Sequence, residues 1–416
     1  MSMGAGGHRP TARAVTAPLS LALTAINLSI AGYLGLLTAV GARRPKQQVS
    51  AGRTTRFAIL VPAHDESAVI GDALDAFHRL DYPRDRFDVH VVADNCSDDT
   101  AAIVRSHGWH AHERIDLEEP GKGPALNWLF DRIDGDLEID GVVIVDADTV
   151  LDPGFLDAMD QAFASGAEVA QGYYSVRDPD GSTSAGIRFA ALACRHHLRP
   201  LGRTRLGASS GLYGNGMAFR PDILRRHRWS GHLVEDAEFQ LELLLRDDVC
   251  VRYVPHARLE AEMPHSFDAS TSQNERWERG RLQLVQRYLP QLVRKLVCCD
   301  SRRLRIADAA VDLVIPPLSA VVALQVTGIF TSGLRAMLPN HRPGGNRRLL
   351  SLHSFTAGLV AAHVLLSLWS VAAPPAVWRS LLHAPTAIVW KLGLWARALR
   401  PKNSVEWNRT RRNSER

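Results

Sequence analysis

Cysteine is scarce in this sequence of 416 residues, and its spacing excludes the common cysteine-based sites. The five cysteines are scattered and odd in number: Cys96, Cys194, Cys250, Cys298 and Cys299. No Cys-x-x-Cys pair or Cys/His cluster offers the ligand spacing of a structural zinc site. Disulfide frameworks are typical of proteins in oxidising compartments. Because these cysteines are scattered and odd in number, we predict reduced thiols in the cytosol.

Other signals are also missing. No Gly-x-Gly-x-x-Gly lies between a predicted strand and helix, which disfavours a dinucleotide-binding Rossmann site. The net charge of +5 and the pI of about 9.1 are only modestly basic. The basic residues flank apolar segments instead of forming one stripe with stacking aromatics, so we predict no nucleic-acid partner. A membrane surface or a phosphate-bearing substrate explains the charge as well.

The N-terminal region contains an uncharged apolar segment. Residues 17–40 carry no charge and are long enough to span about 30 Å of hydrocarbon. Arg43, Arg44 and Lys46 follow at once, so the positive-inside rule places the next domain in the cytosol. We therefore predict a retained anchor in an integral protein of the cell (inner) membrane. A cleaved or peripheral leader is the alternative.

Further apolar segments lie near the C-terminus. They cover residues 309–330, 355–373 and 376–399, and we expect transmembrane or interfacial helices there. If the first two segments both cross the membrane, the arginines between them lie outside, against the positive-inside rule. A re-entrant or interfacial arrangement is therefore the alternative. The predicted organisation is a tail and anchor (1–50), a catalytic domain (51–280), an amphipathic interface helix (281–305), membrane helices (306–400) and a basic tail (401–416). The alternative for residues 281–305 is a helix that packs on its own domain.

Between these regions, strands and helices alternate. Buried strands are expected at 57–62, 89–94, 142–145 and 169–174, with helices between them. This order predicts an α/β fold with a parallel, doubly wound sheet. Its ligand is expected beyond the carboxyl ends of the strands.

Acidic residues follow one of these strands directly. Asp146 and Asp148 are two residues apart after the run Val142–Val145, so both side chains can face one ligand. Their oxygen ligands suit a hard divalent cation. The alternative is a solvated turn after a strand.

Four more segments carry residues suited to binding or catalysis. Lys122 lies in a glycine-rich loop and offers a point charge to phosphate. Glu235 and Asp236 lie at the start of a predicted helix, where an acid stabilises the helix dipole. Capping needs fewer acids than this helix has, so one of them could take part in catalysis. The glycine- and serine-rich residues 207–216 suggest an acceptor gate, with an ordinary surface loop as the alternative. Gln273, Arg276 and Trp277 share one helix face and could hold a sugar and a phosphate: their spacing is i, i+3 and i+4.

The order of motifs resembles the membrane-bound members of glycosyltransferase family 2, of the cellulose synthase, hyaluronan synthase and ceramide glucosyltransferase type. The resemblance covers roughly residues 55–300. Its parts are Val-Pro-Ala-His-Asp-Glu at 61–66, Ala-Asp-Asn-Cys-Ser-Asp-Asp-Thr at 93–100, Gly-Lys-Gly-x-Ala-Leu-Asn at 121–127, Asp-Ala-Asp at 146–148, Glu-Asp at 235–236 and Gln-x-x-Arg-Trp at 273–277. The family usually has Asn at the position of Asp65.

The resemblance implies a GT-A fold and inverting transfer of a sugar from a nucleotide sugar, most often a UDP-sugar, with Mg²⁺ or Mn²⁺. It implies roles for thirteen residues. The donor would be bound by Pro62, Ala63, Asp65, Glu66, Asp94, Lys122 and Asp146, the metal by Asp148, and the diphosphate and acceptor end by Glu235, Gln273, Arg276 and Trp277. Asp236 would be the base.

Three functions stay open at this point. The first is transfer of a sugar to a lipid or lipid-linked glycan, favoured by the few apolar segments. The second is a processive polysaccharide synthase, which needs a channel. The third is a nucleotide-sugar-binding scaffold without turnover. A scaffold needs no catalytic base, so the presence of Asp236 argues against it.

Overall fold

The computed structural model describes residues 12–43, 52–135, 138–263, 266–267, 270–298, 302–337 and 343–398. Some features named above lie outside these residues: Arg44 and Lys46 after the predicted anchor, Cys299, and the predicted basic tail at 401–416. The chain divides into two compact units. One comprises residues 1–36 and 315–365, and the other comprises residues 37–314 and 366–416.

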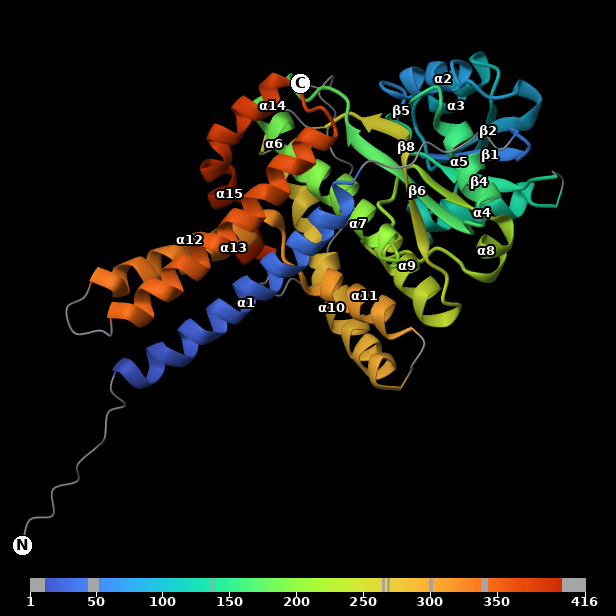
Figure 1. Cartoon of the computed structure of the whole chain (residues 1–416). Helices are drawn as coiled ribbons and strands as arrows, with labels where there is room; N and C mark the ends of the chain where they lie inside the picture. The colour runs from blue at the N-terminus through green and yellow to red at the C-terminus, as the bar shows by residue number, and fades with distance from the viewer. Residues whose placement is uncertain are drawn as a thin grey trace, which may run out of the picture. The chain divides into compact units, whose positions relative to one another are not determined.

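The regular elements are mostly helices, and the strands form one sheet (Figure 1). The strands are β1 Phe57–Ala63, β2 Phe87–Asp94, β3 His110–Arg114, β4 Gly141–Ile144, β5 Thr149–Leu151, β6 Val169–Val176, β7 Met217–Phe219 and β8 Val251–Ala261. The helices of the same unit are α2 Ile70–His78, α3 Thr100–Ser106, α4 Lys122–Ile133, α5 Phe155–Ala164, α6 Thr183–Leu192, α7 Arg199–Arg205, α8 Pro221–Arg226, α9 Glu235–Arg246, α10 Thr271–Cys298, α11 Arg303–Val314, α14 Pro375–Ser380 and α15 Ala384–Ala398. Short helical turns are η1 Arg84–Arg86, the π-helical η2 Ala193–Leu198 and η3 Leu381–His383. The long helices α1 Ala12–Gly41, α12 Leu318–Met337 and α13 Pro343–Ser370 complete the set.

The sheet has eight strands in the order β3-β2-β1-β4-β7-β6-β8-β5. Strands β3, β2, β1 and β4 are parallel neighbours, as are β6 and β8. The predicted α/β fold with a mostly parallel sheet is therefore confirmed. The short strands β7 and β5 run antiparallel to their neighbours, and neither strand was predicted.

Alternate residues of the central strands pack on opposite faces of the sheet. In β1, Ile59 belongs to a core that includes Phe77 of α2 and Phe163 of α5. Its neighbour Leu60 belongs to a second core, with Leu129 of α4 and Phe239 of α9. All six side chains are at most 3% exposed. A strand covered on both faces needs a continuous apolar run, and this run made the strands recognisable in the sequence.

The predicted interface helix 281–305 forms the C-terminal part of α10 and the start of α11. Its apolar residues Leu284, Tyr288 and Leu292 are buried with Ile306 of α11 and Leu244 of α9. This packing within its own unit was the stated alternative. Binding of this helix to a membrane surface stays a prediction.

Three helices have the length and apolar composition of a membrane crossing: Leu19–Gly41, Leu318–Met337 and Gly345–Ser370. The first agrees with the predicted anchor. The second lies later than residues 309–330, because Pro316 and Pro317 separate α11 from α12. The third begins well before residue 355. These candidate spans indicate association with a membrane.

The predicted apolar segment 376–399 contains three short elements, α14, η3 and α15. Lys391 of α15 contacts α10, where its Nζ lies 3.1 Å from Glu278 Oε1 and donates to Asn274 Oδ1 at 2.6 Å. This segment is thus joined to the unit that contains the sheet.

The unit with the candidate spans has a buried polar network. The Asn27 amide donates to the Leu324 carbonyl at 3.0 Å and lies 3.2 Å from Nδ1 of His353. Gln325 donates to Asn27 at 3.3 Å and accepts from the Thr356 hydroxyl at 2.7 Å. Unpaired polar groups are costly in hydrocarbon, so these contacts favour one arrangement of α1, α12 and α13.

Candidate active site

The site lies where parallel strands end. Ala63 of β1 pairs with Ala93 of β2, and Leu60 of β1 pairs with Ile144 of β4, so their carboxyl ends meet at one edge of the sheet. The ends of these strands and the loops after them carry seven of the thirteen predicted residues: Pro62, Ala63, Asp65, Glu66, Asp94, Asp146 and Asp148. Ligands of open α/β sheets bind at such an edge.

Lys122 and Asp146 form an ion pair at this edge. The Lys122 ammonium also donates to the Gly214 carbonyl at 2.5 Å. Burial alone would lower the pKa of Lys122, but the nearby Asp146 and Glu235 carboxylates raise it. Lys122 therefore stays charged, as binding of a phosphate requires.

Glu235 and Asp236, the first two residues of α9, lie beside this pair. A Cβ placed on Gly214 would be 3.4 Å from Asp236 Oδ2 and 3.7 Å from Lys122 Nζ, so the carboxylate and the ammonium flank the same glycine. Burial and the neighbouring Asp236 raise the pKa of Glu235 to about 7. Burial also raises the pKa of Asp236. A carboxylate with a raised pKa is a better proton acceptor near neutral pH.

Glu238, the next acid of α9, has a structural role. It is 3% exposed and accepts from Ser230 at 2.6 Å, Arg287 at 2.8 Å and Tyr288 at 2.9 Å. It joins α9 to α10. The three acids in the first turn of α9 therefore divide into one that holds the fold and two that lie near the Lys122 ammonium.

The turn that carries Asp146 is fixed by a buried amide network. Thr149 N donates to Asp146 O at 3.1 Å, so the two acids lie in a turn after β4. The Asn215 side chain accepts from Asp146 N at 3.1 Å and donates to Thr149 Oγ1 at 2.7 Å. Gln171 donates to Asn215 O at 2.8 Å and accepts from Tyr213 N at 3.0 Å. Neither Asn215 nor Gln171 was predicted.

Asn215→Leu is expected to loosen this turn. Asn215 is fully buried, so the Asp146 amide and the Thr149 hydroxyl would each lose a buried partner. Each loss costs about 1–3 kcal/mol. Thermal unfolding of the purified protein should show a clear drop in stability. Gln161→Ala, which removes a half-buried contact to Asp157, should have a smaller effect, and equal effects would contradict the argument.

Asp148 lies in a pocket together with Glu262 and Asp72. Burial and the charges of Asp148 and Asp146 raise the pKa of Tyr174, so both acids lie near one phenol. Carboxylate oxygens are the ligands that Mg²⁺ and Mn²⁺ prefer. The donor set around Asp148 therefore fits the divalent ion that the fold implies.

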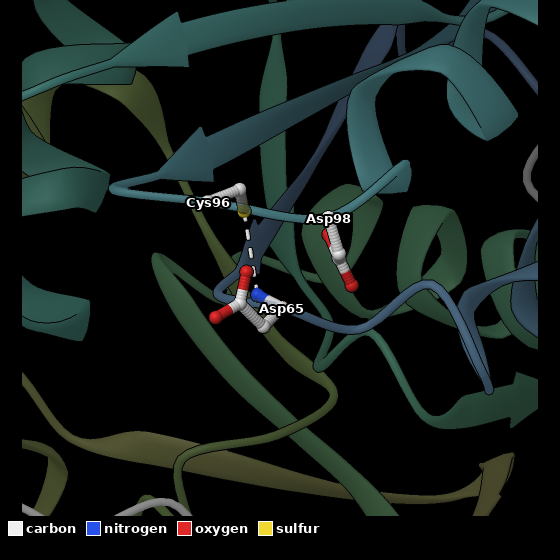
Figure 2. Close-up of side chains that lie close together, drawn as sticks. All are labelled: Asp65, Cys96 and Asp98. Carbon is white, nitrogen blue, oxygen red and sulfur yellow. Dashed lines mark hydrogen bonds between the residues drawn. The ribbon is translucent and has the colours of Figure 1, made fainter.

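A second group of residues has the spacing of a metal site. Side-chain atoms of Asp65, Cys96 and Asp98 lie within 4.8 Å of one another, and Figure 2 shows them between two loops. Hydrogen bonds from Ser67 and Thr100 outweigh burial and lower the pKa of Asp98 to about 2, while burial raises the pKa of Cys96 to about 11. A protonated thiol suits a hard cation poorly. We assign this group to loop structure.

The same loops contain the other predicted donor residues. Asp65 has a φ of 53°, a conformation that Asp and Asn tolerate best, and its carboxylate accepts from Ser97 N at 2.7 Å. Asp therefore fulfils the backbone requirement at the position where the resemblance predicted Asn. Glu66 N donates to Thr100 Oγ1 at 2.9 Å. Pro62 and Ala63 end β1 beside these loops.

Asp94, predicted to hold the nucleoside, forms a buried ion pair. Arg114 donates to Asp94 Oδ1 at 2.6 Å, and both side chains are at most 8% exposed. Asp94 Oδ2 accepts from Gly121 N at 3.4 Å. Arg114 also contacts Asp116 at 2.7 Å. Arg114, which was not predicted, thus fixes Asp94 next to the N-terminus of α4, where Lys122 lies.

Helix α10 carries the last predicted group. Gln273 and Arg276 are half-buried and Trp277 is 40% exposed. Gln273 Oε1 is buried and has no hydrogen-bond partner among the described residues, as a ligand-binding atom would. Burial lowers the pKa of Arg276, and the nearby Glu235 charge opposes this shift. Arg276 therefore lies near Glu235 of α9.

The glycine-rich loop is not the free surface loop that its composition suggested. Residues 208–216 are buried or half-buried. Ser210 N donates to Val251 O at 2.9 Å, and Gly216 N donates to Ile144 O at 2.9 Å. Gly214 and Gly216 have φ values of 78° and 66°, so these glycines serve the backbone conformation. The loop holds Asn215 in place, and its role as an acceptor gate stays a prediction.

Comparison with known proteins supports one family. The family model described as "Glycosyltransferase like family 2" matches residues 55–280. The chain is 26% identical over 269 residues to the probable glycosyltransferase YdaM of Bacillus subtilis (strain 168), which covers 62% of this chain and 63% of that protein. It is 23% identical over 252 residues to the probable glucomannan 4-beta-mannosyltransferase 14 of Arabidopsis thaliana, with coverages of 57% and 46%. The chain therefore matches less than two thirds of either relative.

A solved structure has a related fold. The mannosyltransferase PcManGT from Pyrobaculum calidifontis, solved with GDP-Man and Mn²⁺, superposes with a TM-score of 0.52 at 17% identity. The match covers 85% of this chain and 99% of that one. The sheet and its covering helices thus form a GT-A-like fold. Since the family model covers 55–280, more than half of the 416 residues, the chain belongs to glycosyltransferase-like family 2.

Proposed function

We propose that this protein transfers a hexose from a nucleotide sugar to a hydroxyl group of a membrane-associated acceptor, a lipid or lipid-linked glycan, with inversion at the anomeric carbon. The proposal rests on the group formed by Lys122, Asp146 and Asp236 at the carboxyl edge of the sheet. This group combines a phosphate-binding cation, a carboxylate on the donor side and a proton acceptor. A nucleotide-sugar-binding scaffold without turnover would need no such acceptor.

Asp236 is proposed as the general base. The acceptor oxygen forms a bond to the anomeric carbon, its proton passes to Asp236, and the bond from that carbon to the nucleotide diphosphate breaks. A direct displacement needs one base and no covalent sugar intermediate. The raised pKa of Asp236 suits this role.

The leaving diphosphate must be neutralised. We assign Asp148, with Asp146 beside it, to holding Mg²⁺ or Mn²⁺, and Lys122 and Arg276 to direct contact with the nucleotide. A divalent ion supplies Lewis-acid stabilisation of the diphosphate when bound. PcManGT was solved with Mn²⁺ and GDP-Man, so both GDP-mannose and UDP-sugars are reasonable donors to test.

The nucleoside end is assigned to the loops after β1 and β2. Asp94 would bind the uracil or ribose, and Pro62, Ala63, Asp65 and Glu66 would line its pocket. The pairing of Asp94 with Arg114 supports this role, because it fixes the carboxylate at the strand end. Gln273, Trp277 and Glu235 would contact the diphosphate and acceptor end.

A processive polysaccharide synthase is the second candidate within the same chemistry. Product analysis separates the two. The full-length protein in nanodiscs is incubated with labelled donor and total membrane lipid, and the products are extracted. A lipid-soluble product with one added sugar supports the proposal, whereas a long polymer in the aqueous or insoluble fraction supports the synthase.

The rate should depend on pH through the acids of α9. A base must be deprotonated, so kcat/KM should rise with pH as the Glu235–Asp236 pair loses its proton, with an acid limb near the pKa of about 7 found for Glu235. Glu235→Gln removes a negative charge beside Asp236, so the limb should move to lower pH. The profile is measured from about pH 5 to pH 9. Glu138→Gln, at an exposed pair with Arg56, is the control. An unmoved limb would exclude this coupling.

A further inference from the structure

A π-helical turn places an arginine beside the site. The turn η2, Ala193–Leu198, joins α6 and α7, and such turns are often found at functional sites. His196 and His197 are at most 9% exposed, while Arg195 is exposed. The His196 ring stacks on Tyr213 with centroids 4.1 Å apart, and the Tyr213 hydroxyl donates to the Arg195 carbonyl at 3.2 Å. These contacts fix the backbone of Arg195.

The same contacts connect Arg195 with the proposed base. Gly214 follows Tyr213 directly and lies against Asp236 and Lys122. Burial raises the pKa of Asp236, and the positive charges of Lys122 and Arg195 work against that rise. The Arg195 guanidinium is therefore close enough to act on the carboxylate that receives the acceptor proton.

Three neighbouring cations have acidic partners. Arg199 contacts Asp312 at 2.5 Å, and Arg203 contacts Asp308 at 2.8 Å. Lys391 lies 3.1 Å from Glu278. By contrast, the guanidinium of Arg195 forms no hydrogen bond or ion pair within the described part of the chain. Positive charge thus remains unneutralised next to the site, and an anionic ligand would neutralise it.

We propose that Arg195 binds a phosphate group of the acceptor, so that the acceptor carries a phosphate close to the hydroxyl that is glycosylated. This proposal rests on the proposed function. The donor diphosphate is already assigned to Lys122, Arg276 and the ion held by Asp148. A phosphate oxygen as the nucleophile would need no base and would be repelled by Glu235 and Asp236. The acceptor class is therefore a hydroxyl-bearing phospholipid or a lipid-linked phosphorylated glycan.

The test compares anionic with neutral acceptors. Phosphatidylglycerol and phosphatidylinositol are presented at equal mole fraction with diacylglycerol and glucosyl-diacylglycerol in phosphatidylcholine vesicles. The variants are Arg195→Gln, Arg195→Lys and the control Arg79→Gln. Arg79 is an exposed arginine at the opposite end of α2 from the Asp148 pocket. Transfer, release of nucleotide diphosphate and binding of short-chain phosphatidylglycerol are measured separately.

Wild-type protein should prefer the anionic acceptors. Arg195→Gln should lower kcat/KM for them by about tenfold to a hundredfold, the value of a charge-assisted hydrogen bond. It should leave the donor KM and the slow release of nucleotide diphosphate into water unchanged. Arg195→Lys should be faster than Arg195→Gln and slower than the wild type. Lysine keeps the positive charge but lacks the planar guanidinium, whose paired N–H groups can bind two phosphate oxygens. Arg79→Gln should match the wild type.

Several results would overturn the proposal. Equal use of neutral and anionic acceptors by the wild type would do so. An equal loss of kcat/KM with both acceptor classes in Arg195→Gln would also do so, because it would place Arg195 on the donor diphosphate. Wild-type protein that binds none of the phosphate-bearing probes would also overturn it. Because binding of short-chain phosphatidylglycerol is read without turnover, its loss in Arg195→Gln supports the phosphate site even if no donor reacts. A total absence of donor turnover would count against the proposed function alone.

Discussion

Asp236→Asn is expected to abolish measurable transfer while donor binding remains. Asparagine keeps the shape of the side chain and cannot accept the acceptor proton, so the contribution of a general base, about 10²–10⁴-fold in rate, is lost. The Lys122–Asp146 ion pair does not involve Asp236, so the donor side stays intact. Loss of a negative charge beside Lys122 should leave affinity for an anionic donor equal or higher. Transfer rates and calorimetric titration with the nucleotide sugar measure the two effects.

Asp222→Asn is the matched control for this variant. Asp222 forms an exposed ion pair with Arg226 on α8 and lies outside the proposed machinery. The Asp222→Asn protein should transfer the sugar at the wild-type rate. Asp236→Asn protein that is folded but binds no donor would assign Asp236 to donor binding and contradict its role as base. Full activity in Asp236→Asn would exclude that role directly.

Asp148→Ala is expected to remove most of the metal dependence. If Asp148 holds the divalent ion, the diphosphate loses several kcal/mol of stabilisation, and each 1.36 kcal/mol is tenfold in rate, so the loss should be roughly a hundredfold or more. The apparent affinity for Mn²⁺ should fall in parallel. Release of nucleotide diphosphate as a function of Mn²⁺ concentration, with direct Mn²⁺ binding by electron paramagnetic resonance, measures both.

Cys96→Ser distinguishes the two places where a metal could be held. Cys96 belongs to the group with Asp65 and Asp98 shown in Figure 2, which we assign to loop structure. This variant should keep the wild-type affinity for Mn²⁺. A large loss in Cys96→Ser together with an unchanged Asp148→Ala would move the metal to the loops after β1 and β2.

The parts of the fold that follow from local pattern could be predicted from the sequence. Strands buried on both faces require apolar runs, so β1, β2 and β4 were recognisable, and the parallel order followed from the alternation with helices. Strand β7 could not be predicted because three residues carry no usable periodicity. Its place between β4 and β6 depends on pairing with distant segments.

The same limit applies to the site. The motif residues Lys122, Asp146 and Asp236 were predicted, and the structure brings them together, while their roles stay predictions. Asn215 was missed because its partners Asp146 and Thr149 lie more than sixty residues away in the sequence. Its glycine-rich surroundings suggested flexibility, whereas the positive φ angles serve a buried, hydrogen-bonded loop. Arg114 was missed for a similar reason, since only the pairing of β2 with β3 places it against Asp94.

The most direct test of the account is a donor screen on the purified full-length protein in nanodiscs. A panel that includes UDP-sugars and GDP-mannose is tested for release of nucleotide diphosphate, with Mg²⁺ or Mn²⁺ and with total membrane lipid present. We expect metal-dependent release with one donor, and loss of that release in both Asp148→Ala and Asp236→Asn. Folded protein that binds a nucleotide sugar but releases no diphosphate from any donor would contradict it, and would support a nucleotide-sugar-binding scaffold.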